Sequence, residues 1–179
     1  MARTRFVALA VVGMAFLPAL LAGCTSQPPE PGRYYKKQDG FSIRFPESWE
    51  QKENVMGTVV MALSPPEGAD DAFRENVNVA VESLPTPMDL EKYLELSMAN
   101  LKNLFSAGQE PEVSDAALGG GQAKRIVYQT TMGQVHVKGM LCLAVKGRRG
   151  YTVTCSATPE TFDAYKEPFE KIVETFRFE

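Results

Sequence analysis

The sequence predicts an α+β fold in which an antiparallel β-sheet is sandwiched between helices. Short segments that alternate apolar and polar residues, bounded by proline and glycine turns, indicate strands connected as hairpins. Two longer segments, 89–107 and 158–174, repeat apolar residues at steps of three and four and indicate amphipathic helices. Every residue from 140 to 145 is apolar, so both faces of that strand need cover. One helix on each face would provide it.

The helices have recognisable ends. Asp89 suits the N-cap of the first helix, and Gly108 suits the position after its last turn. Thr158 and Pro159 suit the start of the second helix. The segments expected to form strands are 41–45, 58–64, 76–82, 113–118, 122–131, 134–146, 151–157 and the short 176–178.

Residues 1–23 resemble a bacterial lipoprotein signal peptide. Arg3 and Arg5 precede an apolar run that is shorter than the roughly 20 residues of a membrane span. The run ends in Leu-Ala-Gly-Cys, which resembles the lipobox, where the cysteine receives a diacylglycerol and becomes the first residue of the mature chain. We therefore expect residues 1–23 to be removed and Cys24 to be lipidated. The alternative is an ordinary signal peptide followed by a chance cysteine.

Residues 24–39 are expected to form a tether between the lipid and the folded body. The segment is rich in proline and polar residues, which favours an extended spacer. The domain would then occupy residues 40–179, the size of one ordinary domain. These features predict a lipid-anchored, periplasm-facing protein of the bacterial cell envelope. Thr25 favours the outer membrane slightly, because aspartate after the cysteine tends to retain lipoproteins at the inner membrane of enteric bacteria.

The charge balance argues against two classes of partner. The net charge is −3, and loss of Arg3 and Arg5 would bring it to about −5, which disfavours nucleic acid and broad adhesion to anionic lipid. Contact with the membrane should therefore come from the covalent lipid. With one histidine, His136, and few cysteines, we expect no metal site and no cofactor. The acidic loop 65–76 matches no calcium-binding spacing and is expected to be solvated.

Cys142 and Cys155 lie on consecutive predicted strands. A two- or four-residue loop within 147–150 that pairs Lys146 with Tyr151 would place the cysteines directly opposite each other, with Cβ atoms about 4.5–5.5 Å apart. An oxidising compartment would then permit a disulfide. The alternative is two small buried side chains that stay reduced. A loop of three or five residues would break this register.

No arrangement of residues typical of catalysis is present. The sequence has no Gly-x-Ser-x-Gly, no Ser-x-x-Lys and no cysteine–histidine pattern, and His136 alone on a strand is typical of an ordinary surface residue. We therefore expect no enzyme activity. Arg148 and Arg149, at a hairpin tip, could contact a lipid phosphate or a carboxylate of a partner. The alternative is two solvated turn residues.

Both ends of the predicted domain resemble one family. Residues 40–49, Gly-Phe-Ser-Ile-Arg-Phe-Pro-Glu-Ser-Trp, resemble the opening of PsbP-like domains. Residues 151–157, Tyr-Thr-Val-Thr-Cys-Ser-Ala, with the helix that follows, resemble the family's final strand and helix. The resemblance implies the α/β/α sandwich shared by PsbP-like and Mog1-like domains and by DcrB-type bacterial lipoproteins, which are the most similar in kind. It also implies that the domain binds macromolecules, and it provides no catalytic motif.

Two functions are compatible with these features. We expect a membrane-anchored envelope lipoprotein that acts as a non-enzymatic binding or assembly factor for a membrane or periplasmic protein complex. The alternative is a periplasmic carrier for a small molecule or lipid, which would need an enclosed apolar cavity between the sheet and a helix.

Overall fold

The computed structural model describes residues 30–69, 71–102, 105 and 110–179. The predicted signal peptide, Cys24 and most of the predicted tether lie outside the described residues. A seven-stranded antiparallel sheet has the spatial order β3 (Glu50–Glu53), β4 (Val60–Leu63), β5 (Asn76–Ser83), β9 (Arg149–Ala157), β8 (Val135–Lys146), β7 (Gly121–Met132) and β6 (Glu112–Leu118). A three-stranded sheet has the order β1 (Arg33–Lys36), β2 (Phe41–Arg44) and β10 (Arg177–Phe178). The helices are α1 (Leu90–Leu101) and α2 (Phe162–Glu174).

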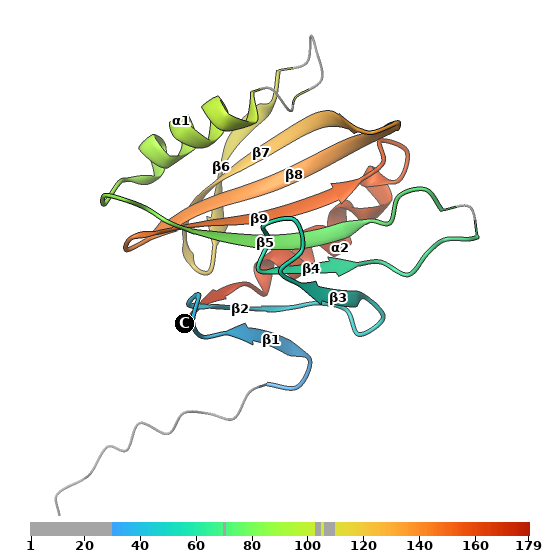
Figure 1. The fold of residues 1–179 in the computed structure, drawn as a ribbon, viewed down its shortest axis with the longest axis horizontal. Helices are drawn as coiled ribbons and strands as arrows, with labels where there is room; N and C mark the ends of the chain where they lie inside the picture. The colour runs from blue at the N-terminus through green and yellow to red at the C-terminus, as the bar shows by residue number, and fades with distance from the viewer. Residues whose placement is uncertain (1–29, 70, 103–104, 106–109) are drawn as a thin grey trace, which may run out of the picture.

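The large sheet is covered on both faces, as the apolar stretch in β8 requires. Helix α1 lies across β7 and β8 on one face, and α2 lies behind β9 on the other (Figure 1). The small sheet packs beside α2 and shares its core. The predicted α+β class and the antiparallel sheet between helices are therefore confirmed. The second sheet was not predicted.

Two hydrophobic cores follow from the alternation of side chains along the strands. On the α1 side, Ile126, Leu141 and Leu143 pack against Tyr93 of the helix. On the α2 side, Met140, Cys142 and Ala144 of the same long strand belong to a larger core. That core also takes aromatic residues from the small sheet, the helix and their connections: Phe41, Phe45, Trp49, Phe162, Phe169 and Phe176.

The predicted strand ends at 131 and 134 would pair Thr131 with Gln134, and the next hairpin was predicted to pair Lys146 with Tyr151. The observed register of both hairpins differs from this by two residues. Each turn begins at a glycine with positive φ, Gly133 (+65°) and Gly147 (+65°), which is the backbone conformation that a tight two-residue turn requires. Met132 therefore pairs with Val135, and Lys146 pairs with Arg149. A shift of two residues leaves every side chain on its predicted face, because strand side chains alternate with period two.

The folded domain begins before Gly40, so the predicted boundary at residue 40 is wrong. Strand β1 lies inside the segment predicted to be tether and pairs antiparallel with β2. Tyr34 accounts for this strand, because its ring packs against Phe41 and Phe45 and its hydroxyl donates to Glu53 at 2.6 Å. Proline and polar residues around Tyr34 gave the segment the composition of a spacer.

The first helix is shorter than predicted. The Asp89 side chain accepts a hydrogen bond from the Lys92 amide at 2.8 Å, so the predicted N-cap is confirmed. The helix ends at Leu101. Residues 103–104 and 106–107, which were predicted to continue it, and Gly108, which was predicted to follow its last turn, lie outside the described residues. Within the described part of the chain, no helix has the length and apolar character needed to cross a membrane.

Candidate functional site

A basic pocket lies where one end of the large sheet meets the small sheet. Its volume is about 510 Å³. The β8–β9 hairpin contributes Lys146, Arg148 and Arg149, and the turn between β1 and β2 contributes Gly40. Ser83, Leu84, Tyr151 and Glu179 complete the lining. Three cationic side chains thus surround a hollow that has one carboxylate side chain in its lining.

The strand register places three of these residues in one row. Arg149 of β9 is directly opposite Ser83 of β5 on one side and Lys146 of β8 on the other. Directly opposed residues project from the same face of a sheet, so the three side chains lie next to one another. Two cations are therefore adjacent at the end of the sheet, where like charges in direct opposition are destabilising.

Arg148 is held by the connection that leads from β5 to α1. Its carbonyl accepts a hydrogen bond from the Leu84 amide at 2.9 Å. Its guanidinium donates to the Pro85 carbonyl at 2.6 Å. The hairpin tip is therefore packed against the connection between β5 and α1. One edge of the Arg148 guanidinium is bonded to the uncharged Pro85 carbonyl oxygen.

The three cations have no ion-pair partner among the residues that the structure describes. Lys146 Nζ lies 4.8 Å from the centre of the Phe178 ring. The carboxylate of Glu179 accepts a hydrogen bond from the Ser42 hydroxyl at 2.5 Å. Positive charge at the pocket is therefore left to solvent or to a ligand.

Gly40 makes room for the Arg149 guanidinium. Its φ is +73°, and a Cβ at this position would lie 3.0 Å from Arg149 Nη1 and 3.2 Å from the Tyr151 hydroxyl. The Tyr151 hydroxyl donates to the Asp39 carbonyl at 3.0 Å and so ties this turn to the large sheet. A glycine here serves both the turn and the close approach of the arginine.

The structure therefore brings Arg148 and Arg149 to one pocket, while their role as contacts for a phosphate or a carboxylate stays a prediction. Arg149 is half-buried, unlike a solvated turn residue, and Arg148 is exposed. Sequence reasoning missed Gly40 and Ser83, which reach the pocket only because β5 neighbours β9 and the β1–β2 turn packs against it.

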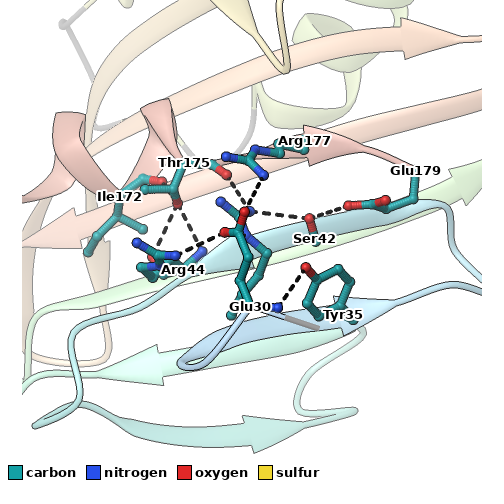
Figure 2. Close-up of polar contacts among 9 residues, drawn as sticks. Glu30, Tyr35, Ser42, Arg44, Ile172, Thr175, Arg177 and Glu179 are labelled. Atoms are coloured by element: carbon teal, nitrogen blue, oxygen red, sulfur yellow. Dashed lines mark hydrogen bonds and ion pairs between the residues drawn. The ribbon is translucent and has the colours of Figure 1, made fainter. Parts of the chain in front are cut away.

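A cluster of arginines around Glu30 holds the start of the domain to its end (Figure 2). The Glu30 carboxylate accepts hydrogen bonds from Arg33 at 3.1 Å, Arg44 at 2.9 Å and Arg177 at 3.0 Å. The side chain of Arg33 is only 2% exposed and also donates to the Thr175 carbonyl at 2.7 Å. Residue 30 is thus attached to strands β1, β2 and β10 at once.

Acidification is expected to loosen β1. Hydrogen bonds from Arg177 and then Arg33 hold the pKa of Glu30 below its usual value of 4.5. Hydrogen bonds from the Tyr34 hydroxyl and then from Lys36 likewise lower the pKa of Glu53. A carboxyl group with a lowered pKa in the folded state stabilises it fully above the usual value, and this contribution is lost as the pH falls through the lowered value.

Hydrogen exchange measured at pH 7 and pH 3 checks this prediction. After correction for intrinsic exchange rates, protection of the β1 amides should fall at pH 3 more than that of Val79 in the centre of the large sheet. Equal protection of the β1 amides at both pH values would contradict it.

The cysteines are not opposite each other, so the predicted disulfide register is wrong. Because Lys146 pairs with Arg149, Cys142 is opposite Val153 and Cys155 is opposite Met140. The cysteines are diagonal neighbours, a relation that separates residues by about 7–8 Å, more than a disulfide allows. Both are free and buried. Burial raises the pKa of both thiols, which keeps them protonated and unreactive near neutral pH.

One carboxylate of the acidic loop is buried rather than solvated. Glu75 is 1% exposed and accepts hydrogen bonds from the Ser64 hydroxyl at 3.1 Å and the Thr161 hydroxyl at 2.6 Å. It therefore connects the loop to the start of α2.

His136 is exposed beside the β7–β8 turn, where Nδ1 lies 3.2 Å from the Thr131 hydroxyl. No group of three or more metal-binding side chains is present in the described part of the chain.

The fold and the pocket define the class of protein. An antiparallel sheet with a helix on one face, and a helix with a small sheet on the other, forms an α+β sandwich domain with a basic hollow at one edge. The family model of PsbP matches residues 31–178, and the chain belongs to this family. The match begins within the segment predicted to be tether, in agreement with the position of β1. The curated proteins gave no match.

Several solved structures share the fold. PsbP of the cyanobacterium Synechocystis sp. PCC 6803 (CyanoP) is 15% identical, with a TM-score of 0.56 over 82% of this chain and 91% of that chain. LpqN of Mycobacterium tuberculosis is 16% identical, with a TM-score of 0.58 over 83% and 85%. PA94 of Pseudomonas aeruginosa is 14% identical, with a TM-score of 0.56 over 80% and 93%. At these identities the likeness is one of fold.

Proposed function

We propose that this chain is a lipid-anchored protein of the bacterial cell envelope whose PsbP domain binds part of a membrane or periplasmic protein complex without catalysing a reaction. The observation that carries the proposal is the basic pocket, in which Lys146, Arg148 and Arg149 have no ion-pair partner among the described residues. Such a hollow offers a partner a charged contact with a defined shape.

The comparisons support an envelope role. LpqN, which has the same fold, is described as involved in cell envelope biogenesis. The sequence of residues 1–24 resembles an export signal followed by a lipobox. Within the PsbP family, we place the chain with the DcrB-type lipoproteins, since those are lipidated and exported. Cys24 would provide the contact with the membrane, and nucleic acid would not be a partner.

The chemistry of the described residues supports binding rather than catalysis. Cys142 and Cys155 are buried with raised pKa values, so neither thiol is a ready nucleophile. His136 is exposed at a turn, and Thr131 is the hydroxyl residue beside it. Their hydroxyl and imidazole are within hydrogen-bond distance, but both side chains are exposed at a hairpin turn, whereas ligand and substrate sites are usually concave.

The length of the predicted tether limits how far the domain can lie from the membrane. Five residues, 25–29, separate Cys24 from Glu30, and an extended chain over these six Cα-to-Cα steps reaches at most about 22 Å. Because Glu30 is held by three arginines, the reach is shorter than if the domain began at residue 40. A partner would therefore be a membrane protein or a periplasmic protein that works close to the membrane.

The structure gives little support to the alternative of a carrier. A carrier cavity was expected to be an enclosed apolar space between the sheet and a helix. On the α1 side, a hollow of about 480 Å³ lies between the start of the helix and β6–β7, but polar and charged side chains such as Asp89, Glu91 and Lys124 make up most of its lining. On the α2 side, large side chains fill the space. Met140 is 2% exposed, Phe176 is 1% exposed, and Phe169 is fully buried. A ligand there would have to displace a close-packed core.

Site-specific crosslinking in cells tests the proposal. A photoreactive residue at Ser83, on the exposed rim of the pocket, should give adducts with one or a few envelope proteins. The same residue at Lys166, exposed on α2, serves as the matched control. Adducts specific to position 83 that are lost in a Cys24→Ser chain would support the proposal. Identical adducts at both positions, or none at position 83, would refute it.

A further inference from the structure

We propose that the basic pocket binds the phosphate group of an organic phosphate ester, and that its source is the headgroup of an anionic phospholipid. The identification of the phosphate rests on the pocket alone. The identification of the lipid source rests on the proposed anchoring at Cys24, which would hold the pocket close to a membrane.

Positive charges are placed unfavourably close together in the pocket. Lys146 and Arg149 form a directly opposed cross-strand pair, and like charges in this position destabilise a sheet. Arg148 adds a third cation in the turn between them. Strand pairs at sheet ends normally avoid this arrangement, and a bound anion would convert the repulsion into attraction.

The hydrogen-bond donors and positive charges of the pocket suit a phosphate group. The backbone of Arg149 belongs to the sheet, but its guanidinium makes no hydrogen bond or ion pair with any described residue and is available for bidentate contact with two phosphate oxygens. Lys146 provides a point charge beside this guanidinium. Gly40, without a side chain, lets Arg149 Nη1 lie close to the backbone of the β1–β2 turn. Phosphate, with several acceptor oxygens and up to two negative charges, matches this set.

The volume of the basic pocket also suits a phosphate ester. A volume of about 510 Å³ lies within the range of about 300–1,000 Å³ that is typical of small-molecule sites, and it exceeds what a bare phosphate ion needs. Leu84 and Tyr151 also belong to the lining, and both are almost fully buried. The pocket therefore admits a phosphate with an attached glycerol or similar group. The one carboxylate in the lining, Glu179, is engaged by the Ser42 hydroxyl.

Titration of the mature chain from residue 24, carrying Cys24→Ser to prevent lipidation, tests the phosphate assignment. The probe is glycerol 3-phosphate, followed by nuclear magnetic resonance of the backbone amides. Saturable shifts are expected at Gly40 and Arg149, and affinity should fall as salt rises. The Lys146→Gln/Arg149→Gln variant should bind at least about tenfold more weakly, because it loses both the Arg149 guanidinium and the Lys146 ammonium group.

The control for net charge is Lys166→Gln/Lys171→Gln, which removes two exposed cations from α2. Its affinity should stay within about twofold of the parent chain, since these residues lie away from the pocket. Thermal melting should show that both double variants stay folded. If Lys146→Gln/Arg149→Gln is not folded, the single variant Lys146→Gln replaces it, because Lys146 is exposed. This single variant should still weaken binding. Equal weakening in the control would show that binding depends on net charge, and would overturn the proposal.

Two further arms identify the source of the phosphate. Vesicles of phosphatidylcholine with phosphatidylglycerol should bind the same chain, pure phosphatidylcholine vesicles should not, and Lys146→Gln/Arg149→Gln should abolish the difference. Binding of glycerol 3-phosphate without binding to the anionic vesicles would overturn the lipid source. Failure of both probes, or saturation by an acidic peptide in place of them, would overturn the phosphate assignment. The headgroup would occupy the hollow, while the protein partner of the proposed function would contact its rim at Ser83. The crosslinks at Ser83 therefore test the proposed function separately from these outcomes.

Discussion

Replacing Cys24 with serine is expected to release the protein from the membrane fraction. A serine hydroxyl cannot take the place of the thiol that receives the diacylglycerol, so the chain would lose its acyl chains. Each buried methylene contributes about 0.8 kcal/mol, and two or three acyl chains together hold a protein stably. The acidic net charge offers little overall electrostatic hold in their absence, and a high-salt wash screens the remaining contact of the basic pocket with anionic headgroups.

Fractionation of cells measures this effect. The parent protein should stay in the pellet after a high-salt wash, whereas at least about nine-tenths of the Cys24→Ser protein should move to the supernatant. The matched control is Thr25→Ser, which changes the adjacent residue to the same side chain and should stay in the pellet. A Cys24→Ser protein that resists the wash as the parent does would contradict the lipid anchor.

Replacing Gly150 with alanine is expected to destabilise the domain by about 1–3 kcal/mol, the usual cost of overpacking a core. A Cβ at this position would lie 2.4 Å from Tyr93 Cζ and 2.5 Å from its hydroxyl oxygen. Tyr93 is 3% exposed, and its hydroxyl donates to Glu82 at 2.6 Å. The ring can therefore move only if α1 shifts away from the sheet or the hydrogen bond breaks.

Urea denaturation measures the free energy of unfolding of this variant. The control is Gly68→Ala, because a Cβ on Gly68 would meet nothing within 4 Å and its φ is not in the left-handed region. It should change stability by less than about 0.5 kcal/mol. The double variant Gly150→Ala/Tyr93→Leu should lose less unfolding free energy than the sum of the single changes, since leucine lacks the ring and hydroxyl atoms that the new Cβ would meet. A Gly150→Ala protein as stable as the parent would contradict the packing described.

The faces of the long strands could be predicted because alternation has a period of two. Ile126 and Leu141 fall in one core and Cys142 in the other, as the pattern indicates. The register depends on which residues occupy the turn, and both turns begin at a glycine with positive φ. The disulfide prediction failed for this reason, because it needed the register and not only the face.

The candidate site could be predicted only where its residues are neighbours in sequence. Arg148 and Arg149 follow each other at a turn and were identified together. Ser83 joins them through the pairing of β5 with β9, which no local pattern encodes. The same holds for Glu30, whose partners Arg44 and Arg177 are far away along the chain. Contacts of this kind follow from topology.

Intact-mass measurement of the protein extracted from membranes tests the central claim most directly, namely that a PsbP domain is carried on a membrane by a lipid at Cys24. We expect a mature chain that begins at Cys24 and carries the mass of a diacylglycerol, with or without a further acyl chain on the amino group. A mature chain that begins at another residue, or an unmodified Cys24, would contradict it.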